Sequence, residues 1–344
     1  MIRTILTFLF ILSSEPLRAA VAPSSEQQLI QAVPECDVDQ DGKLTPSEIW
    51  YARNLSVAKS EPWLLAVKLI GASYTPSTLS DDDRYGPEVG RKIKLFILSG
   101  QSNMVGQGLS AELPEELVKQ NNRLLMFEGG KWQPLRPLNS LFGPEITFAH
   151  TMAKRYPNET IGIVKQSIGG TGVLAWHPQW TQEKADLTDD GKKGNLWQEL
   201  TSKVHGAKTA ADCQIMGFIW MQGGKDMLLM ETGESYLRNL KALVDGIRDF
   251  TDSPDLPFVL GSYRTPAVPD DVSNFDFTEL VVKGRPGYAA VLKAQQQAEV
   301  ELAPAKMIPL RNLETHPRNV HYNTQGQRQL GRLFAEGYVE LIEP

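Results

Sequence analysis

The segment Ile93-Lys-Leu-Phe-Ile-Leu-Ser-Gly-Gln-Ser-Asn-Met104 joins a continuous apolar run to a glycine and a serine. An apolar run of this length is typical of a strand that is buried on both faces of a parallel sheet. A serine in the turn after such a strand can expose its hydroxyl to a ligand and offer its own backbone N–H to an oxyanion. The segment therefore predicts a buried strand that ends in a functional loop.

Further apolar runs of strand length recur along the chain and alternate with stretches of helical length. We expect strands at 93–98, 160–165, 215–221, 257–261 and 307–310, and helices at 145–155, 195–207, 235–250, 288–302 and 324–341. This alternation predicts an α/β fold in which a mainly parallel sheet lies between helices. Ligands of such sheets bind beyond the carboxyl ends of the strands, so the residues after each strand are the candidates for a site.

Polar or glycine-rich loops follow three of these strands. Ser102 follows the first, Gly169-Gly170-Thr-Gly172 follows the second, and Gln222-Gly-Gly-Lys-Asp226 follows the third, while His321 precedes the last helix. A hydroxyl, an imidazole, an amide and bare backbone N–H groups are the components of a serine hydrolase site. The serine is not in a G-x-S-x-G elbow, because Met104 takes the last position of that motif.

Residues 1–22 have the pattern of a secretory signal peptide. Arg3 precedes a short apolar run at 5–12, and Ala20-Val-Ala22 is a small-residue cleavage pattern. The run is shorter than the ~20 apolar residues that a membrane-spanning helix needs. We therefore expect a secreted or periplasmic protein with no membrane association after signal removal. An uncleaved amino-terminal anchor is the alternative.

Residues 23–70 contain a segment, 37–48, that fits the calcium-binding loop of an EF-hand. Ca²⁺ prefers oxygen ligands, and Gly42 stands where such a loop must turn sharply. The expected ligands are Asp37, Asp39, Asp41, Lys43 through its carbonyl, Thr45 and Glu48. We expect a structural calcium ion here. A module that docks a protein partner and a plain acidic turn are the alternatives. Residues 71–90 are rich in turn formers and predict a linker, so the main domain is expected at 91–344.

The composition excludes several classes of protein. Thirty-five basic and forty-one acidic residues give a net charge of −6, which lacks the basic footprint of a nucleic-acid binder. Apolar residues at 41% and charged residues at 22% are typical of globular proteins and not of disordered chains. Cys36 and Cys213 are the two cysteines, too few for a disulfide scaffold, and whether they pair is left open.

Three blocks of the main domain resemble the SGNH/GDSL hydrolases, and in particular their sialate O-acetylesterase and acetylxylan-esterase branch. The blocks are Gly100-Gln-Ser-Asn-Met104, Trp220-Met-Gln-Gly223 and Val320-His321, and the likeness extends over most of 91–341. It implies a flavodoxin-like three-layer α/β/α sandwich and the removal of O-acetyl groups from carbohydrates without a cofactor. It also implies that Ser102 is the nucleophile, that His321 is the base, and that oxyanion donors come from Ser102, Gly169 or Gly170, and Gln222.

The chain departs from this family at the catalytic acid. Gly224 and Arg318 stand where the family carries a glutamate and an aspartate. The acid of the protease triad is worth ~10⁴ in kcat, or about 5.4 kcal/mol of barrier. Arg318 is also expected to lower the basicity of His321. Three alternatives stay open: Asp226 is the acid, Glu314 is the acid, or the protein is a weak or inactive esterase that binds glycans.

Overall fold

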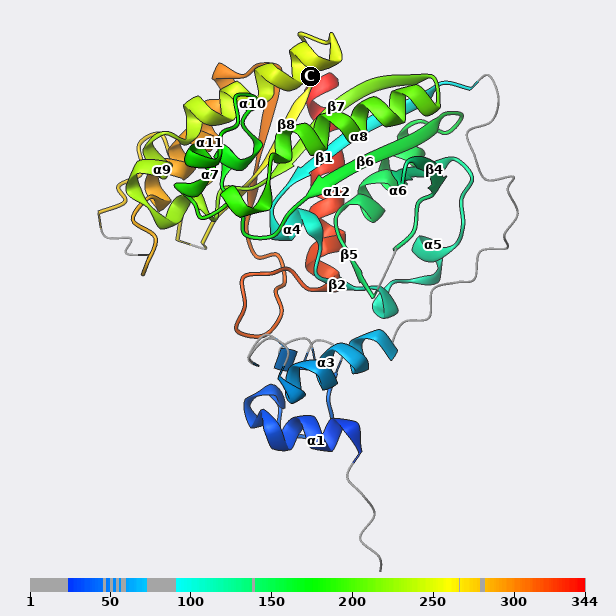
Figure 1. Ribbon diagram of the computed structural model, residues 1–344, viewed down its shortest axis with the longest axis vertical. Coiled ribbons are helices and arrows are strands. Elements are labelled where there is room, and N and C mark those ends of the chain that lie inside the picture. The colour runs from blue at the N-terminus through cyan, green and yellow to red at the C-terminus, as the bar shows by residue number, and fades with distance from the viewer. Residues whose placement is uncertain are drawn as a thin grey trace, which may run out of the picture.

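The computed structural model describes residues 24–343 except 46–47, 50–51, 54–55, 57–59, 73–90, 138–139, 266 and 279–281. The predicted signal peptide lies outside the described residues. So does the predicted linker, apart from its first two residues, which end helix α3 (Glu61–Ala72). The described residues form a large α/β domain and a small helical module at its amino end (Figure 1).

The large domain is built on a seven-stranded sheet with the order β4-β3-β6-β1-β7-β8-β9. The strands are β1 (Ile93–Gly100), β3 (Leu124–Glu128), β4 (Lys131–Pro134), β6 (Thr160–Ser167), β7 (Cys213–Met221), β8 (Phe258–Tyr263) and β9 (Ala305–Leu310). All neighbours pair in parallel except β3 and β4, which form an antiparallel hairpin at one edge. Without this hairpin the order is that of flavodoxin, whose ligand site lies at the carboxyl ends of the central strands.

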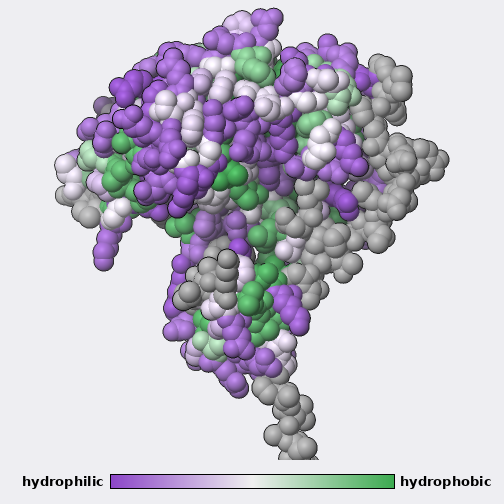
Figure 2. Space-filling view, in the orientation of Figure 1, coloured by the Kyte–Doolittle hydropathy of each residue, from purple (hydrophilic) through white to green (hydrophobic). Residues whose placement is uncertain are grey.

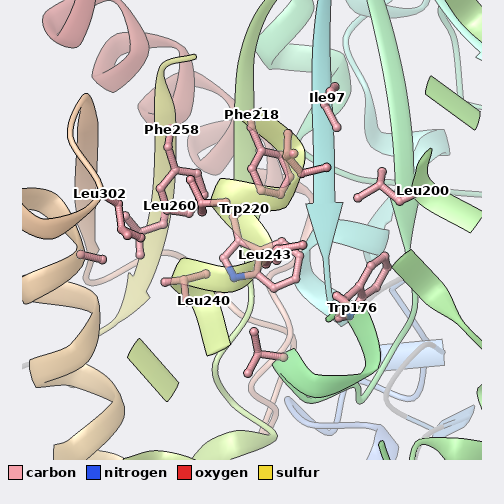
Figure 3. Close-up of a cluster of buried hydrophobic side chains, with 14 of the residues drawn as sticks. Ile97, Trp176, Leu200, Phe218, Trp220, Leu240, Leu243, Phe258, Leu260 and Leu302 are labelled. Carbon is pink, nitrogen blue, oxygen red and sulfur yellow. The ribbon is translucent and has the colours of Figure 1, made fainter. Parts of the chain in front are cut away.

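Helices cover both faces of the sheet. One face packs against α8 (Leu196–Ala210), α10 (Tyr236–Thr251) and α11 (Tyr288–Glu301), and the other against α6 (Glu145–Arg155) and α12 (Thr324–Ile342). On the first face, aromatic and branched side chains of neighbouring strands interleave with leucines of α8 and α10 (Figure 3). The predicted α/β sandwich with a mainly parallel sheet is thus confirmed.

Short elements fill the connections. They are β2 (Gly108–Leu109), α5 (Glu115–Val118), β5 (Leu141–Phe142), α7 (Gln182–Asp186) and α9 (Met230–Glu234). β2 and β5 form a separate two-stranded antiparallel sheet. None of the described helices combines the length and the hydrophobicity that a bilayer span requires.

The amino-terminal module has its own small core. Helix α1 (Ser25–Ala32) begins with a capping box between Ser24 and Gln27 and packs with α3 around buried apolar side chains that include Cys36. Leu109 of β2 belongs to the same core, so the module packs directly on the large domain. Hydrophobic residues gather along this junction (Figure 2). Cys36 and Cys213 are both free thiols.

Candidate active site

Ser102 lies at the carboxyl edge of the sheet, where β1 ends and α4 (Ser102–Val105) begins. Gly100 has a φ of 143°, and a side chain at this position would collide with the backbone of Met221 in β7. Glycine therefore allows β1 to turn while it stays close to its neighbour. As the first residue of α4, Ser102 has a backbone N–H with no acceptor inside the helix. The turn presents both the hydroxyl and the N–H of Ser102 at the end of the sheet.

His321 comes from the loop between β9 and α12. Asn103, the neighbour of Ser102, holds the backbone on both sides of this histidine: its Nδ2 donates to Val320 O at 3.2 Å, and its Oδ1 accepts from Tyr322 N at 3.1 Å. The same Nδ2 lies 3.2 Å from the hydroxyl of Tyr263. Asn103 is buried, so solvent does not compete for these bonds. It joins the serine turn to the histidine loop across more than two hundred residues of sequence.

Ser102 and His321 line one pocket of about 890 Å³. The pocket also contains Gly169, Gly170 and Tyr263, so the carboxyl ends of several strands contribute to it. Burial lowers the pKa of His321 below its ordinary value of 6.5, which keeps the imidazole neutral at neutral pH. A neutral imidazole and an accessible hydroxyl in one pocket are the groups that a general base and its nucleophile provide.

The glycine loop after β6 lies next to Ser102. A side chain on Gly169 would stand 3.9 Å from Cβ of Ser102. Lys193 fixes the loop from the other side, because its Nζ donates to the carbonyls of Gly169 at 3.1 Å and Gly170 at 2.8 Å. Buried Asp190 anchors Lys193 at 2.6 Å and accepts the N–H of Gly172 at 2.7 Å.

Gln222 is not placed as the sequence predicts. It is fully buried, and its Nε2 donates to the carbonyl of Thr171 at 2.8 Å and to Asp226 at 2.5 Å. These two bonds use both amide hydrogens beneath the glycine loop, so no N–H of Gln222 faces an oxyanion. The physical reason is that the N–H groups of a buried amide form hydrogen bonds with the acceptors that surround them. Gln222 supports the loop and does not line the pocket.

Asp226 is likewise not positioned as the predicted acid. Its carboxylate accepts from Gln222 and, at 3.1 Å, from the N–H of Val173. It is inaccessible to solvent and does not line the pocket, and burial raises its pKa to about 7. These contacts direct Asp226 to the backbone under the glycine loop instead of to His321. Both residues of the Gln222–Asp226 pair thus hold the loop that carries Gly169 and Gly170.

The other candidate acids lie outside the pocket as well. Glu314 is exposed and accepts from Asn323 Nδ2 at 3.3 Å, and neither it nor the exposed Arg318 lines the pocket. The space where a side chain of residue 224 would start is covered by Gln101 and Arg285, and Arg285 donates to the carbonyl of Gly224 at 3.1 Å. Among the described residues that line the pocket, none is Asp or Glu.

Burial, and not a neighbouring charge, explains the low basicity of His321. The expected effect of Arg318 is not seen, because Arg318 points into solvent and desolvation is the cause of the lowered pKa. His316 is a close neighbour, since its N–H donates to His321 O at 3.0 Å. Its Nε2 lies 2.7 Å from the carbonyl of Gln107, and burial lowers its pKa to about 4. His316 is therefore neutral and adds no charge to the site.

The loop at 37–48 in the module brings three of the six predicted oxygen ligands close together. Carboxylate oxygens of Asp37, Asp39 and Glu48 lie within 4.8 Å of one another. Gly42 has a φ of 76° and donates its N–H to Asp37 at 3.1 Å, which closes the sharp turn. Buried Glu48 accepts the N–H groups of Val38 at 2.8 Å and Thr45 at 2.9 Å. The donors are oxygens, so the loop fits a hard cation such as Ca²⁺.

Sequence reasoning missed three residues of the site: Asn103, Tyr263 and Arg53. Asn103 stands inside the motif that identified Ser102, but nothing in one sequence shows that its amide reaches residues 320–322. Tyr263 ends β8, where the rule about carboxyl ends of strands applies to it. Arg53 comes from the amino-terminal module and lines the pocket, and no motif points to it.

The fold and the pocket together define a hydrolase of the α/β sandwich class, with a serine and a histidine at the carboxyl edge of the sheet. Comparison with known proteins makes this assignment specific. Residues 92–340 match the model of the family described as carbohydrate esterase, sialic acid-specific acetylesterase. The chain belongs to this family, and it is therefore an esterase of the group that acts on acetylated carbohydrates.

The individual relatives share less than a quarter of their residues with this chain. A protein of Arabidopsis thaliana named a probable carbohydrate esterase is 23% identical over 295 residues, which cover 78% of this chain and 98% of the relative. Its solved structure has a TM-score of 0.56 at 22% identity and covers 72% of this chain and 98% of that one. NanS has a TM-score of 0.53 at 17% identity, covering 73% and 98%. A carbohydrate acetylesterase from Xanthomonas citri has a TM-score of 0.52 at 18% identity, covering 72% and 56%. At these identities the structures show a shared fold.

Proposed function

We propose that this protein is a secreted carbohydrate O-acetylesterase in which Ser102 is the nucleophile and His321 the general base. The observation that carries the proposal is the common pocket of these two side chains, together with the buried Asn103 that binds the backbone around His321. The family supports acetylated carbohydrates as the substrate class.

In the first half-reaction, Ser102 Oγ attacks the acetyl carbonyl carbon while His321 takes the hydroxyl proton. A carbon–oxygen bond forms, and the carbonyl electron pair moves onto its oxygen. Backbone N–H groups of Ser102 and Gly170 support this charge. The carbonyl of Gly169 accepts a hydrogen bond from Lys193. Because the peptide bond between Gly169 and Gly170 is trans, the N–H of Gly170 points in the opposite direction, away from Lys193. Collapse breaks the bond to the sugar oxygen, which receives the proton from His321.

In the second half-reaction, water attacks the acetyl-serine and gives a proton to His321. The same N–H groups support the second oxyanion. Its collapse releases acetate and returns the proton to Ser102. Neither step needs a metal or an organic cofactor, and none is assigned to the catalytic pocket.

The absence of Asp and Glu from the described pocket lining sets an expectation for the rate. His321 becomes positive in each half-reaction, and no carboxylate lines the described part of the pocket to stabilise that charge. The acid of the protease triad contributes ~10⁴ in kcat. We therefore expect turnover that depends on Ser102 but is slower than that of a complete triad.

Hydrolysis of p-nitrophenyl acetate and of an O-acetylated sugar by wild type and Ser102→Ala tests the proposal. Wild type should release acetate from both substrates and Ser102→Ala from neither. Ser202→Ala is the matched control, because Ser202 is exposed on α8 and does not line the pocket. Equal rates for wild type and Ser102→Ala would overturn the assignment of the nucleophile.

Glycan binding with little or no turnover is the second candidate function. The absence of Asp and Glu among the described lining residues favours it, and so does the position of Arg285 over Gly224. Saturable binding of an acetylated oligosaccharide by a wild-type protein that releases no acetate would support this function instead.

We also propose that the loop at 37–48 binds one structural Ca²⁺ ion. The oxygen donors of Asp37, Asp39, Asp41, Lys43, Thr45 and Glu48 would hold it. Calorimetric titration of Ca²⁺ should show one site in wild type and in Glu35→Ala, whose exposed carboxylate lies outside the loop, and none in Asp37→Ala. Equal heats in all three proteins would contradict the site.

The export of the protein is a separate proposal that rests on residues 1–22 alone. Cleavage after Ala22 would give a mature chain that begins at Pro23. Amino-terminal sequencing of protein recovered from outside the cytoplasm tests it, and a chain that still begins at Met1 would contradict it.

A further inference from the structure

The amino-terminal module contributes a charged side chain to the catalytic pocket. Arg53 lines the pocket together with Ser102 and His321. Its position is fixed, because Ile49 and Ala52 of the same segment are buried in the module core that also contains Leu109 of the large domain. The family match begins at residue 92, so this wall of the pocket is supplied by a part of the chain outside the family domain.

Arg53 carries a charge that the described residues do not neutralise. Its guanidinium is half-buried, and within the described ranges no ion pair or hydrogen bond joins it to a carboxylate. Desolvation lowers its pKa, and no acidic side chain among the described residues offsets the cost of its burial. Guanidinium groups bind carboxylates through two parallel hydrogen bonds, and a free, partly desolvated one is suited to a ligand of that kind.

The rest of the pocket has the same sign of charge. Lys225, Arg264 and Arg285 also line it, and no Asp or Glu does so among the described residues. Arg264 is only 7% exposed, and its Nε and Nη1 have no hydrogen-bond partner in the described part of the chain. In a protein of net charge −6, a pocket with four cationic side chains and no described anionic one attracts an anionic ligand.

The pocket is large enough for Arg53 and the reacting serine to contact different parts of one substrate. Its volume of about 890 Å³ lies near the upper end of the ~300–1,000 Å³ found for pockets that hold drug-sized ligands, so it has room for more than one sugar ring. In Figure 1 the loop between β9 and α12 lies between α4, which begins at Ser102, and the module. Arg53 comes from the module and Ser102 from the end of β1, so the two side chains line the pocket from different parts of the chain.

We propose that the module forms a second subsite, in which Arg53 binds a carboxylate on a sugar unit next to the acetylated unit. The substrate class is then an O-acetylated acidic oligosaccharide. This inference rests on the proposed esterase function and adds a specificity residue from outside the esterase domain.

A matched pair of substrates tests the subsite. One is an O-acetylated oligogalacturonide, and the other is the same oligosaccharide after its carboxyl groups are reduced to alcohols. Wild type should prefer the acidic form. Arg53→Gln should lower that preference, measured as the ratio of kcat/KM values, at least tenfold, because hydrogen bonds to charged groups are about twice as strong as neutral ones. Arg53→Lys should keep only part of the preference, because lysine retains the positive charge but cannot form the two parallel hydrogen bonds of a guanidinium group.

The controls separate the possible failures. Arg332→Gln removes an exposed arginine on α12 that pairs with Glu336, and it should keep the wild-type preference. Thermal unfolding of each variant shows whether the module stays folded. A wild type that does not distinguish the two substrates, or an Arg53→Gln variant that keeps the full preference, overturns the subsite while the esterase function stands. Acetate release that is the same in wild type and in Ser102→Ala overturns the esterase function itself.

Discussion

Asn103 is the residue whose removal should disturb catalysis most without touching either reacting side chain. Asn103→Ala deletes contacts to Val320 O, Tyr322 N and Tyr263 OH. A net contribution of about 1 kcal/mol for each bond gives a loss of roughly 3 kcal/mol in the free energy of unfolding. At roughly 2–4 °C for each kcal/mol in a domain of this size, Tm should fall by about 6–12 °C.

The kinetic effect should be larger than the loss of stability implies. The three bonds set how the loop of His321 lies relative to the turn of Ser102, and a displacement of about 1 Å in such a site costs ~10² in rate. We expect kcat for p-nitrophenyl acetate to fall about a hundredfold at a temperature where the variant is fully folded. Asn103→Asp should not rescue the rate, because a carboxylate cannot donate to the carbonyl of Val320.

Asn239→Ala is the matched control for this experiment. Asn239 of α10 is also buried and donates through Nδ2 to Ser235, the residue before this helix, but it does not line the pocket. The Asn239→Ala variant should have a lower free energy of unfolding than wild type and an unchanged kcat. If Asn103→Ala loses only stability and its kcat stays at the wild-type value, the inference that Asn103 aligns the two catalytic residues is wrong.

Three further predictions concern pH and metal. Because burial raises the pKa of Asp226 from 3.8 to about 7, the folded chain binds this proton more tightly than the unfolded one. The free energy of unfolding should therefore fall as pH rises from about 4 to about 7, and Tm of Asp226→Asn should depend less on pH in this window. Since burial lowers the pKa of His321 below 6.5, kcat/KM should be flat through neutral pH and fall only in more acidic buffer, about tenfold per pH unit; a fall that begins above pH 7 would contradict this. Ca²⁺ at about 100 times its Kd should stabilise wild type by about 2.7 kcal/mol and leave Tm of Asp37→Ala unchanged, and an equal shift in both would contradict binding at the loop.

The regular elements of the large domain follow closely from the sequence, because each buried strand is a continuous apolar run. The expected helix at 145–155 coincides with α6, and the expected strand at 215–221 falls within β7. The β3–β4 hairpin was not predicted, although its Gly129-Gly130 turn is a recognised hairpin signal. Its second strand is short and half polar, so it lacks the apolar run on which the other predictions rest.

The site was harder to predict than the fold, because its details depend on which way buried polar groups turn. The position of Ser102 follows from the rule about strand ends, and His321 was predicted from its place before the last helix. The directions of Gln222 and Asp226 do not, since each is decided by acceptors and donors from the glycine loop some fifty residues earlier in the chain. Arg53 enters the pocket through packing of the module on Leu109, which no local pattern encodes.

Covalent labelling tests the central claim most directly. An organophosphate such as diethyl p-nitrophenyl phosphate reacts with a serine only when a nearby base activates it. After treatment, mass spectrometry should find the diethylphosphoryl group on the peptide that contains Ser102, and His321→Ala should abolish the label while the protein stays folded. A wild-type chain that takes no label, or one labelled at Ser102 to the same extent without His321, would contradict the partnership of these two residues.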